Sequence, residues 1–184
     1  MSDRDIEAEL LLLMAAAPDT TSPLACALLA SILTFPQTMH AVRNELADAM
    51  SAGTLRPGQP TPWSSISRLS YFMACVNEAS RLFPPIPAIL PRAVGRGGMI
   101  LSDCRVVPEG TAVGVAAAVI NRDKGVFGED AMVWNPERWL ADDERVKRMH
   151  RFVFTWGWGS RSCAGKNVAL LECCKLVLQV SHFA

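Results

Sequence analysis

The 184-residue chain contains no CxxC pair, no internal repeat and no low-complexity tract. Its six cysteines therefore favour neither a zinc site nor a disulfide framework, and we expect most of them to be buried, reduced thiols. The chain also lacks a basic surplus, because 18 lysines and arginines balance 18 aspartates and glutamates. Nucleic-acid-binding proteins usually carry such a surplus, so we expect no nucleic-acid partner. This cysteine usage fits a compartment that faces the cytosol.

No targeting peptide is visible at the N-terminus, because residues 2–9 are charged and mostly acidic. Residues 10–33 are long enough and apolar enough to cross a bilayer. The centre of this stretch, however, reads PDTTSP, and the charge of Asp19 would be costly in the middle of a membrane. We therefore expect a long, buried core helix with a polar break, and a membrane span is the alternative.

Hydrophobic residues make up 50% of the chain, which excludes a disordered segment and allows one domain with a core. Short apolar runs separated by turn residues between 99 and 115 predict a small β region. Residues 121–161 show little periodicity and predict a long irregular segment, which is usually functional in a compact domain. The fold class is therefore mainly α with a small β region. The expected helices cover residues 3–34 with a break near Pro18, 36–51, 66–83 and 164–180.

Two of these helices have an apolar face that we expect to be buried. In the helix of residues 36–51, Val42 and Leu46 lie on that face together with Met39 and Met50. The expected apolar face of the last helix consists of Val168, Leu171, Leu176 and Val180.

The segment FTWGWGSRSCAGK, residues 154–166, is the most informative part of the sequence. Gly157 and Gly159 permit tight or left-handed turns, which would make Cys163 project from the loop. We expect a helix to begin directly after Cys163. The partial positive charge at its N-terminus would stabilise a thiolate there. The alternative is an ordinary buried cysteine in a glycine-rich hairpin.

Two further residues of this loop suit a cofactor. Gly165 has no side chain, so a flat ligand could approach the backbone closely. Arg161 offers a forked, permanently charged donor that matches a carboxylate. The loop therefore indicates a metal-binding thiolate beside a cation that can hold the acidic edge of a cofactor.

Three other segments carry charged or hydroxyl groups at informative spacing. Glu78 and Arg81 share one helix face and can pair, although many solvated helices contain such a pair by chance. Residues 135–139 read NPERW, which taken alone is a surface turn. Residues 16–21 read AAPDTT, in which Asp19 or Thr20 could instead cap a second helix.

Together these segments resemble the C-terminal portion of the cytochrome P450 family, from the I helix through the heme-binding loop to the L helix. The loop is similar to F-x-x-G-x-R-x-C-x-G with Trp156 for Phe, and residues 78–81 are similar to the K-helix ExxR. Residues 135–139 resemble the P-E-R-F segment with Trp139 for Phe, and residues 16–21 resemble A-G-x-D-T-T with Ala17 for Gly. The run from 90 to 140 looks most like fungal members.

The resemblance implies a role for each matching residue. Cys163 would be the metal ligand, holding heme b (iron protoporphyrin IX) through its thiolate. Asp19 and Thr20 would be catalytic and would handle protons. The other implied sets are the cofactor-binding residues Arg92, Trp156, Gly157, Arg161 and Gly165, the structural ion cluster Glu78, Arg81 and Arg138, and the substrate-pocket residues Ile86, Ala88 and Ile89. Residues 121–123 resemble the family's H-R-D with Asn121 for His.

The resemblance implies a truncated P450 fold in which residues 1–184 form the C-terminal part of one domain. The N-terminal part, its anchor and the extreme C-terminus would then be absent. The implied activity is that of a heme-thiolate monooxygenase, which inserts one oxygen atom of O2 into a small organic substrate with electrons from an NADPH-dependent P450 reductase. Family members usually face the cytosol from the endoplasmic reticulum membrane. The alternative is a non-catalytic remnant that is inactive or binds heme without turnover.

Overall fold

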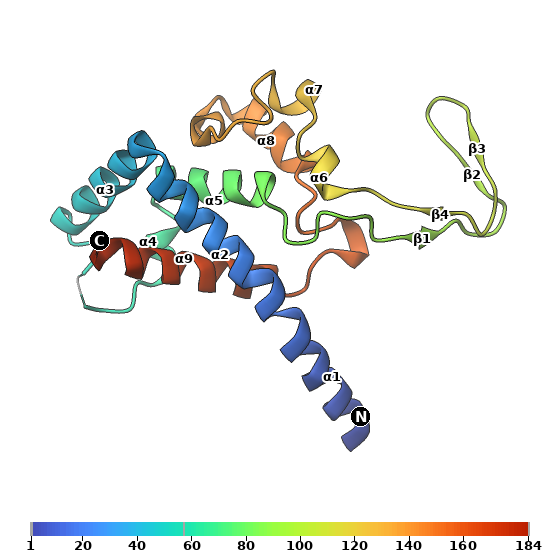
Figure 1. Ribbon diagram of the computed structural model, residues 1–184, viewed down its shortest axis with the longest axis horizontal. Helices are drawn as coiled ribbons and strands as arrows, with labels where there is room; N and C mark the ends of the chain where they lie inside the picture. Colours follow the sequence, from blue (N-terminus) through green and yellow to red (C-terminus); the bar gives the residue numbers. More distant parts are fainter. Residues whose placement is uncertain (1, 57, 184) are drawn as a thin grey trace.

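The computed structural model describes residues 2–56 and 58–183, and it is mainly helical with a small β region projecting at one side (Figure 1). This confirms the predicted fold class. The α-helices are α1 (Asp3–Ala16), α2 (Pro18–Thr34), α3 (Pro36–Ser51), α4 (Trp63–Ile66), α5 (Ser70–Leu82), α6 (Ala117–Ile120), α7 (Lys124–Phe127), α8 (Asp143–Phe152) and α9 (Lys166–Phe183). The 3-10 helices are η1 (Pro136–Leu140) and η2 (Gly159–Arg161). The strands are β1 (Arg92–Ala93), β2 (Met99–Ile100), β3 (Val106–Val107) and β4 (Ala112–Val113).

The predicted break near Pro18 is confirmed, because α1 ends at Ala16 and Pro18 is the first residue of α2. Proline has no N–H to continue the hydrogen-bond ladder, but its fixed φ suits the first turn of a new helix. The helix α2 then buries an apolar stripe that includes Leu24, Leu28 and Ile32. Its N-terminal turn, by contrast, stays accessible, which leaves the polar break free to face a cavity.

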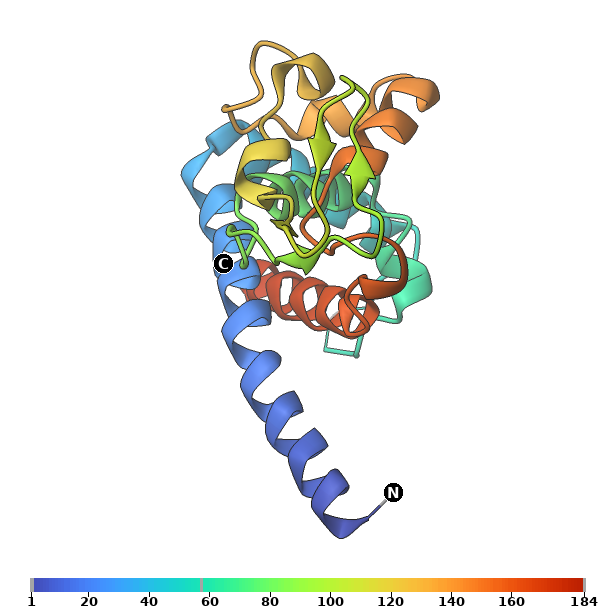
Figure 2. The same cartoon turned by 90° about the vertical axis from the view of Figure 1, so that its right-hand side faces the viewer.

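The expectation of a buried core helix is wrong for α1 in this chain. None of its residues is buried, and the side chains from Leu10 to Met14 are between 54% and 72% exposed. The helix projects away from the rest of the molecule, and α2 continues from it toward the core (Figures 1 and 2). By length and composition the stretch Asp3–Thr34 could cross a membrane, and only 11% of its most apolar window is buried.

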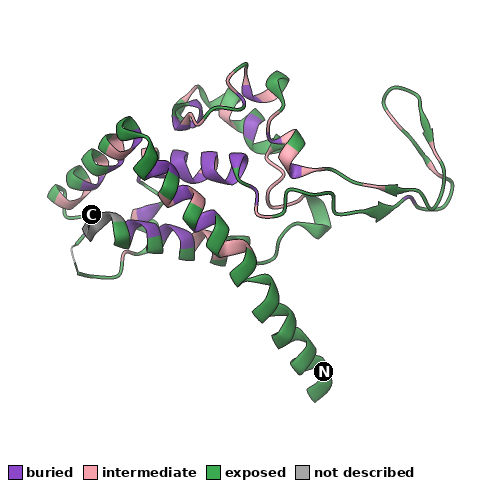
Figure 3. Ribbon diagram, viewed as in Figure 1, coloured by how far each residue is buried: buried purple, intermediate pink, exposed green. Residues whose placement is uncertain are grey.

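The main core lies where α2, α3, α5 and α9 meet, and α5 is the most completely buried of these helices (Figure 3). The prediction for α3 is confirmed, because Val42 and Leu46 are buried. The break between α4 and α5 departs from the single helix predicted for residues 66–83. The carboxylate of Glu45, on α3, explains the new start: it accepts hydrogen bonds from the backbone N–H groups of Tyr71 (2.8 Å) and Phe72 (2.9 Å).

The apolar face predicted for the last helix is wrong. Val168, Leu176 and Val180 are exposed, whereas the face that packs on α2 carries Cys173 and Cys174. Cysteine is among the residue types most often buried, and a small thiol lets two helices approach closely. Burial raises the pKa of the Cys173 thiol to about 11 and that of Cys174 to about 12, so both stay protonated at neutral pH. Val177 and Leu178 are buried on the same face one turn later, so aliphatic residues lie on both faces of α9 and did not by themselves mark the contact face.

The β region consists of two antiparallel pairs, β1 with β4 and β2 with β3. The predicted small β region between residues 99 and 115 contains β2, β3 and β4, whereas β1 and its pairing with β4 were not predicted. The helix α8 was missed, since it lies inside the segment predicted to be irregular. Its surface is highly charged, but Val146 and the buried Met149 have helical spacing and could have revealed it. Asp142 caps the helix by accepting a hydrogen bond from the N–H of Arg145 at 3.0 Å.

We expect the 184-residue chain, expressed alone, to self-associate in a concentration-dependent manner. The exposed apolar side chains of α1 form a continuous surface that water solvates poorly. Size-exclusion chromatography with light scattering measures the association. The double substitution Leu11→Lys and Met14→Lys should weaken it, and Glu9→Lys is the control because it changes charge on the same helix without removing apolar area. A chain that stays monomeric over a wide concentration range would contradict this expectation.

Candidate functional site

Glycine turns and one short backbone bond shape the loop that carries Cys163. Gly157 and Gly159 have φ values of +69° and +66°, a region that side-chain-bearing residues rarely occupy. A Cβ on Gly157 would also lie only 3.3 Å from the carbonyl oxygen of Arg161. The N–H of Cys163 donates to the carbonyl of Trp156 at 2.7 Å, which closes the loop. The predicted helix follows, since α9 begins at Lys166.

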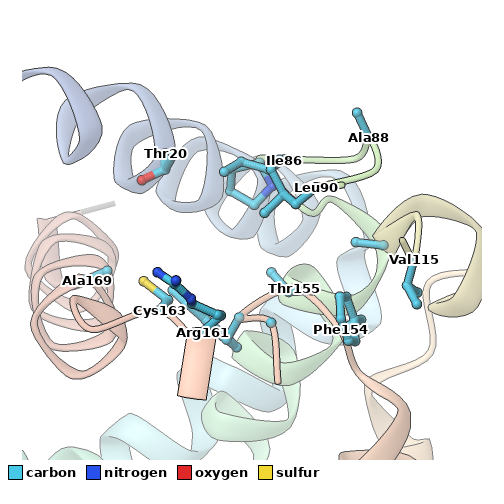
Figure 4. A pocket seen from close by; sticks show the side chains of 14 residues that line it. Thr20, Ile86, Ala88, Leu90, Val115, Phe154, Thr155, Arg161, Cys163 and Ala169 are labelled. Atoms are coloured by element: carbon cyan, nitrogen blue, oxygen red, sulfur yellow. The ribbon is translucent and has the colours of Figure 1, made fainter. Parts of the chain in front are cut away.

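The sulfur of this loop faces a cavity of about 250 Å³ (Figure 4). Thr20, on α2, lies on one side of the cavity, and Cys163 and Arg161 lie on the opposite side. Ile86 and Ala88, in the segment after α5, contribute apolar side chains to its wall. The complete lining is Thr20, Pro85, Ile86, Ala88, Leu90, Val115, Ala117, Phe154, Thr155, Trp156, Gly157, Arg161, Cys163 and Ala169.

Four residues predicted for the site are absent from that lining. Arg92 instead donates to the backbone carbonyl of Pro91 at 2.9 Å, and Ile89 forms an isolated β-bridge with Ala116. Asp19 is exposed on α2, next to Thr20. Gly165 lies beside the sulfur, because a Cβ built on it would be 3.9 Å from Cys163 Sγ. The roles assigned to these residues stay predictions.

The hydroxyl of Thr20 is oriented by the helix break. Its Oγ1 donates to the carbonyl oxygen of Ala16 at 2.9 Å, across the junction of α1 and α2. Such a bond to the preceding turn is common for threonine in helices, and it fixes the hydroxyl proton on the backbone. The oxygen lone pairs of Thr20 are then available to a donor in the cavity.

Behind the cavity, Glu78, Arg81 and Arg138 meet in a fully buried ion cluster. Glu78 Oε1 lies 2.7 Å from Arg81 Nη2 and 3.1 Å from Arg138 Nε. All three side chains are at most 1% exposed. Because a buried charge without partners is very unfavourable, both guanidinium groups depend on the carboxylate of Glu78, and that carboxylate depends on them.

The sequence reasoning missed two members of this cluster. Asp130 pairs with Arg138 at 2.9 Å, so that two carboxylates balance two guanidinium groups. Desolvation alone would raise the pKa of Asp130, but hydrogen bonds from Asn135 and Arg138 outweigh it and hold that pKa below its ordinary value. Trp139 Nε1 donates to Glu78 Oε2 at 2.9 Å. No sequence spacing links Asp130 to the cluster. Trp139, by contrast, replaces the Phe of the P-E-R-F segment, and this departure could have indicated an additional hydrogen-bond donor.

The Cys163 loop separates the cavity from a second hollow of about 580 Å³. Cys163 contributes to both, and the second hollow is further lined by Trp139, His150, Trp158 and Lys166. Burial, together with the charge of Lys166, lowers the pKa of His150, so this imidazole is neutral at pH 7.

The donor set of the cavity fits a thiolate-bound, carboxylate-bearing macrocycle better than a bare metal ion. No group of three or more His, Cys, Asp or Glu residues in the described part of the chain is arranged to hold a metal ion. Cys163 therefore offers a single protein ligand, which suits a metal that arrives already held by a cofactor. The guanidinium of Arg161 forms no ion pair with any side chain that the structure describes, and so it can take an anionic edge.

Comparison with known proteins agrees with this geometry. The sequence model of the family described as Cytochrome P450 matches residues 1–180. A cytochrome P450 monooxygenase of Aspergillus flavus is 44% identical over 161 residues, which cover 88% of this chain and 31% of that protein. The cytochrome P450 monooxygenase pkfB of Emericella nidulans is 43% identical over 147 residues, covering 80% of this chain and 28% of that protein. One from Sarocladium schorii is 36% identical over 165 residues, covering 89% and 32%.

The three relatives named above are fungal proteins, which agrees with the resemblance of residues 90–140 to fungal members of the family. The chain spans about a third of the length of these curated relatives.

We expect Trp139→Phe to destabilise the full-length protein by about 1–3 kcal/mol, because the buried Glu78 Oε2 loses one of its two donors and keeps only Arg81 Nε, while the apolar contacts largely remain. Urea unfolding monitored by circular dichroism measures the change. Trp63→Phe is the matched control, since Trp63 is 41% exposed and its indole donates no hydrogen bond to any described residue. Equal unfolding midpoints for the two variants would show that the indole N–H contributes nothing to the cluster.

Proposed function

Because the chain belongs to the cytochrome P450 family, we propose that it carries the thiolate loop and part of the oxygen-side wall of a heme-thiolate monooxygenase. The observation that carries this proposal is the position of Cys163, whose sulfur faces a cavity across from the Thr20 hydroxyl. A ligand lying flat between them would have a sulfur on one face and a hydroxyl on the other. The family implies a heme cofactor, and this cavity suits one.

The residues that would hold the heme come from the loop and its flanks. Cys163 would bind the iron, and Arg161 would pair with a propionate as a bidentate donor. Trp156 lies next to Gly157 in the cavity wall and would shield the sulfur from water. Gly165 would leave room beside the sulfur, because it adds no side chain there. Arg92 would serve as a second propionate partner only after releasing its backbone carbonyls.

When bound, the heme would activate O2 so that one oxygen atom enters an organic substrate and the other becomes water, with electrons from a reductase. Thr20 would hold a proton in place on the opposite side of the cavity. Its hydroxyl is the one polar side-chain group that α2 contributes to the described lining. Asp19 precedes it on the exposed surface and would connect that hydroxyl with solvent protons.

The substrate side of the cavity is apolar. Ile86, Ala88 and Leu90 line it and are exposed in this chain, so an organic substrate would lie against aliphatic carbon rather than charge. Ile89, which lies outside the lining, would contribute only if the segment moved. The small, aliphatic wall favours an apolar portion of the substrate near the reaction centre.

The reductase would meet the opposite face of the Cys163 loop. Lys147, Arg148 and Arg151 are exposed on α8, whose His150 lines the second hollow together with the exposed Lys166 at the start of α9. Lys147 is already paired with Glu144 at 2.9 Å. The positive charge available to a partner therefore comes from Arg148, Arg151 and Lys166. This basic surface would attract an acidic, NADPH-dependent P450 reductase in the cytosol.

For the 184 residues alone, a remnant without turnover is the second candidate. The exposed apolar surface of α1 favours it, because a chain that self-associates would not hold a cofactor in a defined position. Heme content and product formation of the isolated chain distinguish the two candidates.

Replacing Cys163 with alanine in the full-length protein should abolish the thiolate signature. The carbon monoxide difference spectrum of the reduced protein is the measurement, since its Soret position reports a sulfur ligand. Cys104→Ala is the control, because Cys104 is exposed and lies between β2 and β3, outside the cavity lining. A Cys163→Ala protein that keeps the thiolate band would refute the assignment of the ligand.

Thr20→Ala should uncouple oxygen consumption from product formation, because the cavity loses the hydroxyl that holds a proton there. The ratio of product formed to NADPH oxidised measures coupling. Thr20→Ser should restore most of it, and Thr21→Ala should leave it unchanged because Thr21 lines a different hollow. Normal coupling in Thr20→Ala would mean that protons reach the cavity by another route.

A further inference from the structure

Asn121 is completely buried directly after α6, yet its side chain is polar and does not line the cavity. Its Nδ2 donates to the backbone carbonyl of Arg81 at 3.0 Å and to Thr155 Oγ1 at 2.9 Å. Its Oδ1 accepts from the N–H of Phe154 at 2.8 Å. These partners lie 33 to 40 residues away along the chain, so the hydrogen bonds join segments that are distant in the sequence.

The orientation of this carboxamide follows from its partners. The Arg81 carbonyl can only accept a hydrogen bond, and the Phe154 N–H can only donate one. The amide nitrogen must therefore face Arg81, and the amide oxygen must face Phe154. Both N–H groups and the oxygen are then satisfied, as a fully buried asparagine requires.

The contacts of Asn121 connect the ion cluster with the Cys163 loop. Arg81, which pairs with Glu78, also donates through Nη1 to the Asn121 backbone carbonyl at 2.8 Å, so the two residues bond reciprocally. On the other side, Phe154 and Thr155 lie in the cavity wall directly before Trp156. Trp156 in turn accepts the hydrogen bond from the N–H of Cys163. The Thr155 hydroxyl strengthens the link by donating to the carbonyl of Ser80.

We propose that Asn121 is a positioning residue that fixes the segment 154–156, and through it the sulfur of Cys163, relative to α5. The proposal rests on the proposed function, because the sulfur needs a fixed position only if it binds a metal. A thiolate ligand that can move away from its metal is readily protonated and lost. The three hydrogen bonds of Asn121 would therefore prolong the time for which the thiolate stays bound to the metal. Asn121 itself would not touch the cofactor.

The substitution Asn121→Leu keeps the number and branching of the side-chain heavy atoms but leaves the Arg81 carbonyl, the Thr155 hydroxyl and the Phe154 N–H without this partner. Asn121→His keeps one donor and one acceptor, so it should restore part of the effect. Thr155→Val removes a single partner hydroxyl. Asn44→Leu is the matched control, since Asn44 is exposed on α3.

The test uses the heme-loaded, full-length protein and two readouts other than turnover. The first is the rate at which the carbon monoxide complex loses its thiolate band on mild heating. The second is hydrogen exchange of the peptide covering residues 153–163. We expect both rates to rise about tenfold or more in Asn121→Leu and several-fold in Thr155→Val, as the loss of buried hydrogen bonds implies. In the double variant of Asn121→Leu and Thr155→Val, the rate of band loss should rise by no more than the product of the two single-variant increases, because the two residues share one hydrogen bond.

Retention of the band and of exchange protection in Asn121→Leu at the rates of Asn44→Leu would overturn the proposal. If Asn121→Leu does not fold, Thr155→Val decides: a rate equal to that of Asn44→Leu overturns the proposal, and a faster one supports it. A wild-type protein without any thiolate band would instead overturn the proposed function, and the positioning role would fall with it.

Discussion

The buried carboxylate of Glu78 is the constraint on which the rest of the structure depends. It is fully desolvated, and it is tolerated because Arg81, Arg138, Trp139 and the backbone N–H of Asn135 all donate to it. Removing one charged partner from such a cluster typically costs about 3–5 kcal/mol, which is a large share of the stability of a domain. The helix α5 and the segment that contains η1 are therefore held at a fixed separation, although little regular structure joins them.

This constraint extends to the sulfur of Cys163. Arg81, which pairs with Glu78, also donates through Nη1 to the backbone carbonyl of Asn121. The Asn121 side chain in turn accepts a hydrogen bond from the N–H of Phe154, where the chain leads into the Cys163 loop. Buried groups that are joined by hydrogen bonds move little relative to one another, because the close-packed atoms around them leave no room for displacement. The loop contains only the single-turn 3-10 helix η2, so its position comes mainly from its glycine turns and from this buried network.

The two sides of the cavity differ in how firmly they are built. The sulfur side is tied to the core by bonds that connect residues far apart in the sequence. The opposite side consists of α2, whose first turn is accessible, and of an exposed aliphatic segment around Ile86 and Ala88. The sulfur side is therefore held more firmly than the wall across the cavity.

The sequence by itself determined the local features of this protein. Glycines at 157 and 159, the proline at 18 and the ExxR spacing act through backbone geometry within a few residues, so the loop, the helix break and the Glu78–Arg81 pair could be predicted. Tertiary structure alone decided which face of α9 is buried, that Asp130 completes the ion cluster, and that Asn121 bonds to Phe154. Those contacts join residues that are distant along the chain or carry no periodic signal, and they arise only when whole elements pack together and every buried polar group must find a partner.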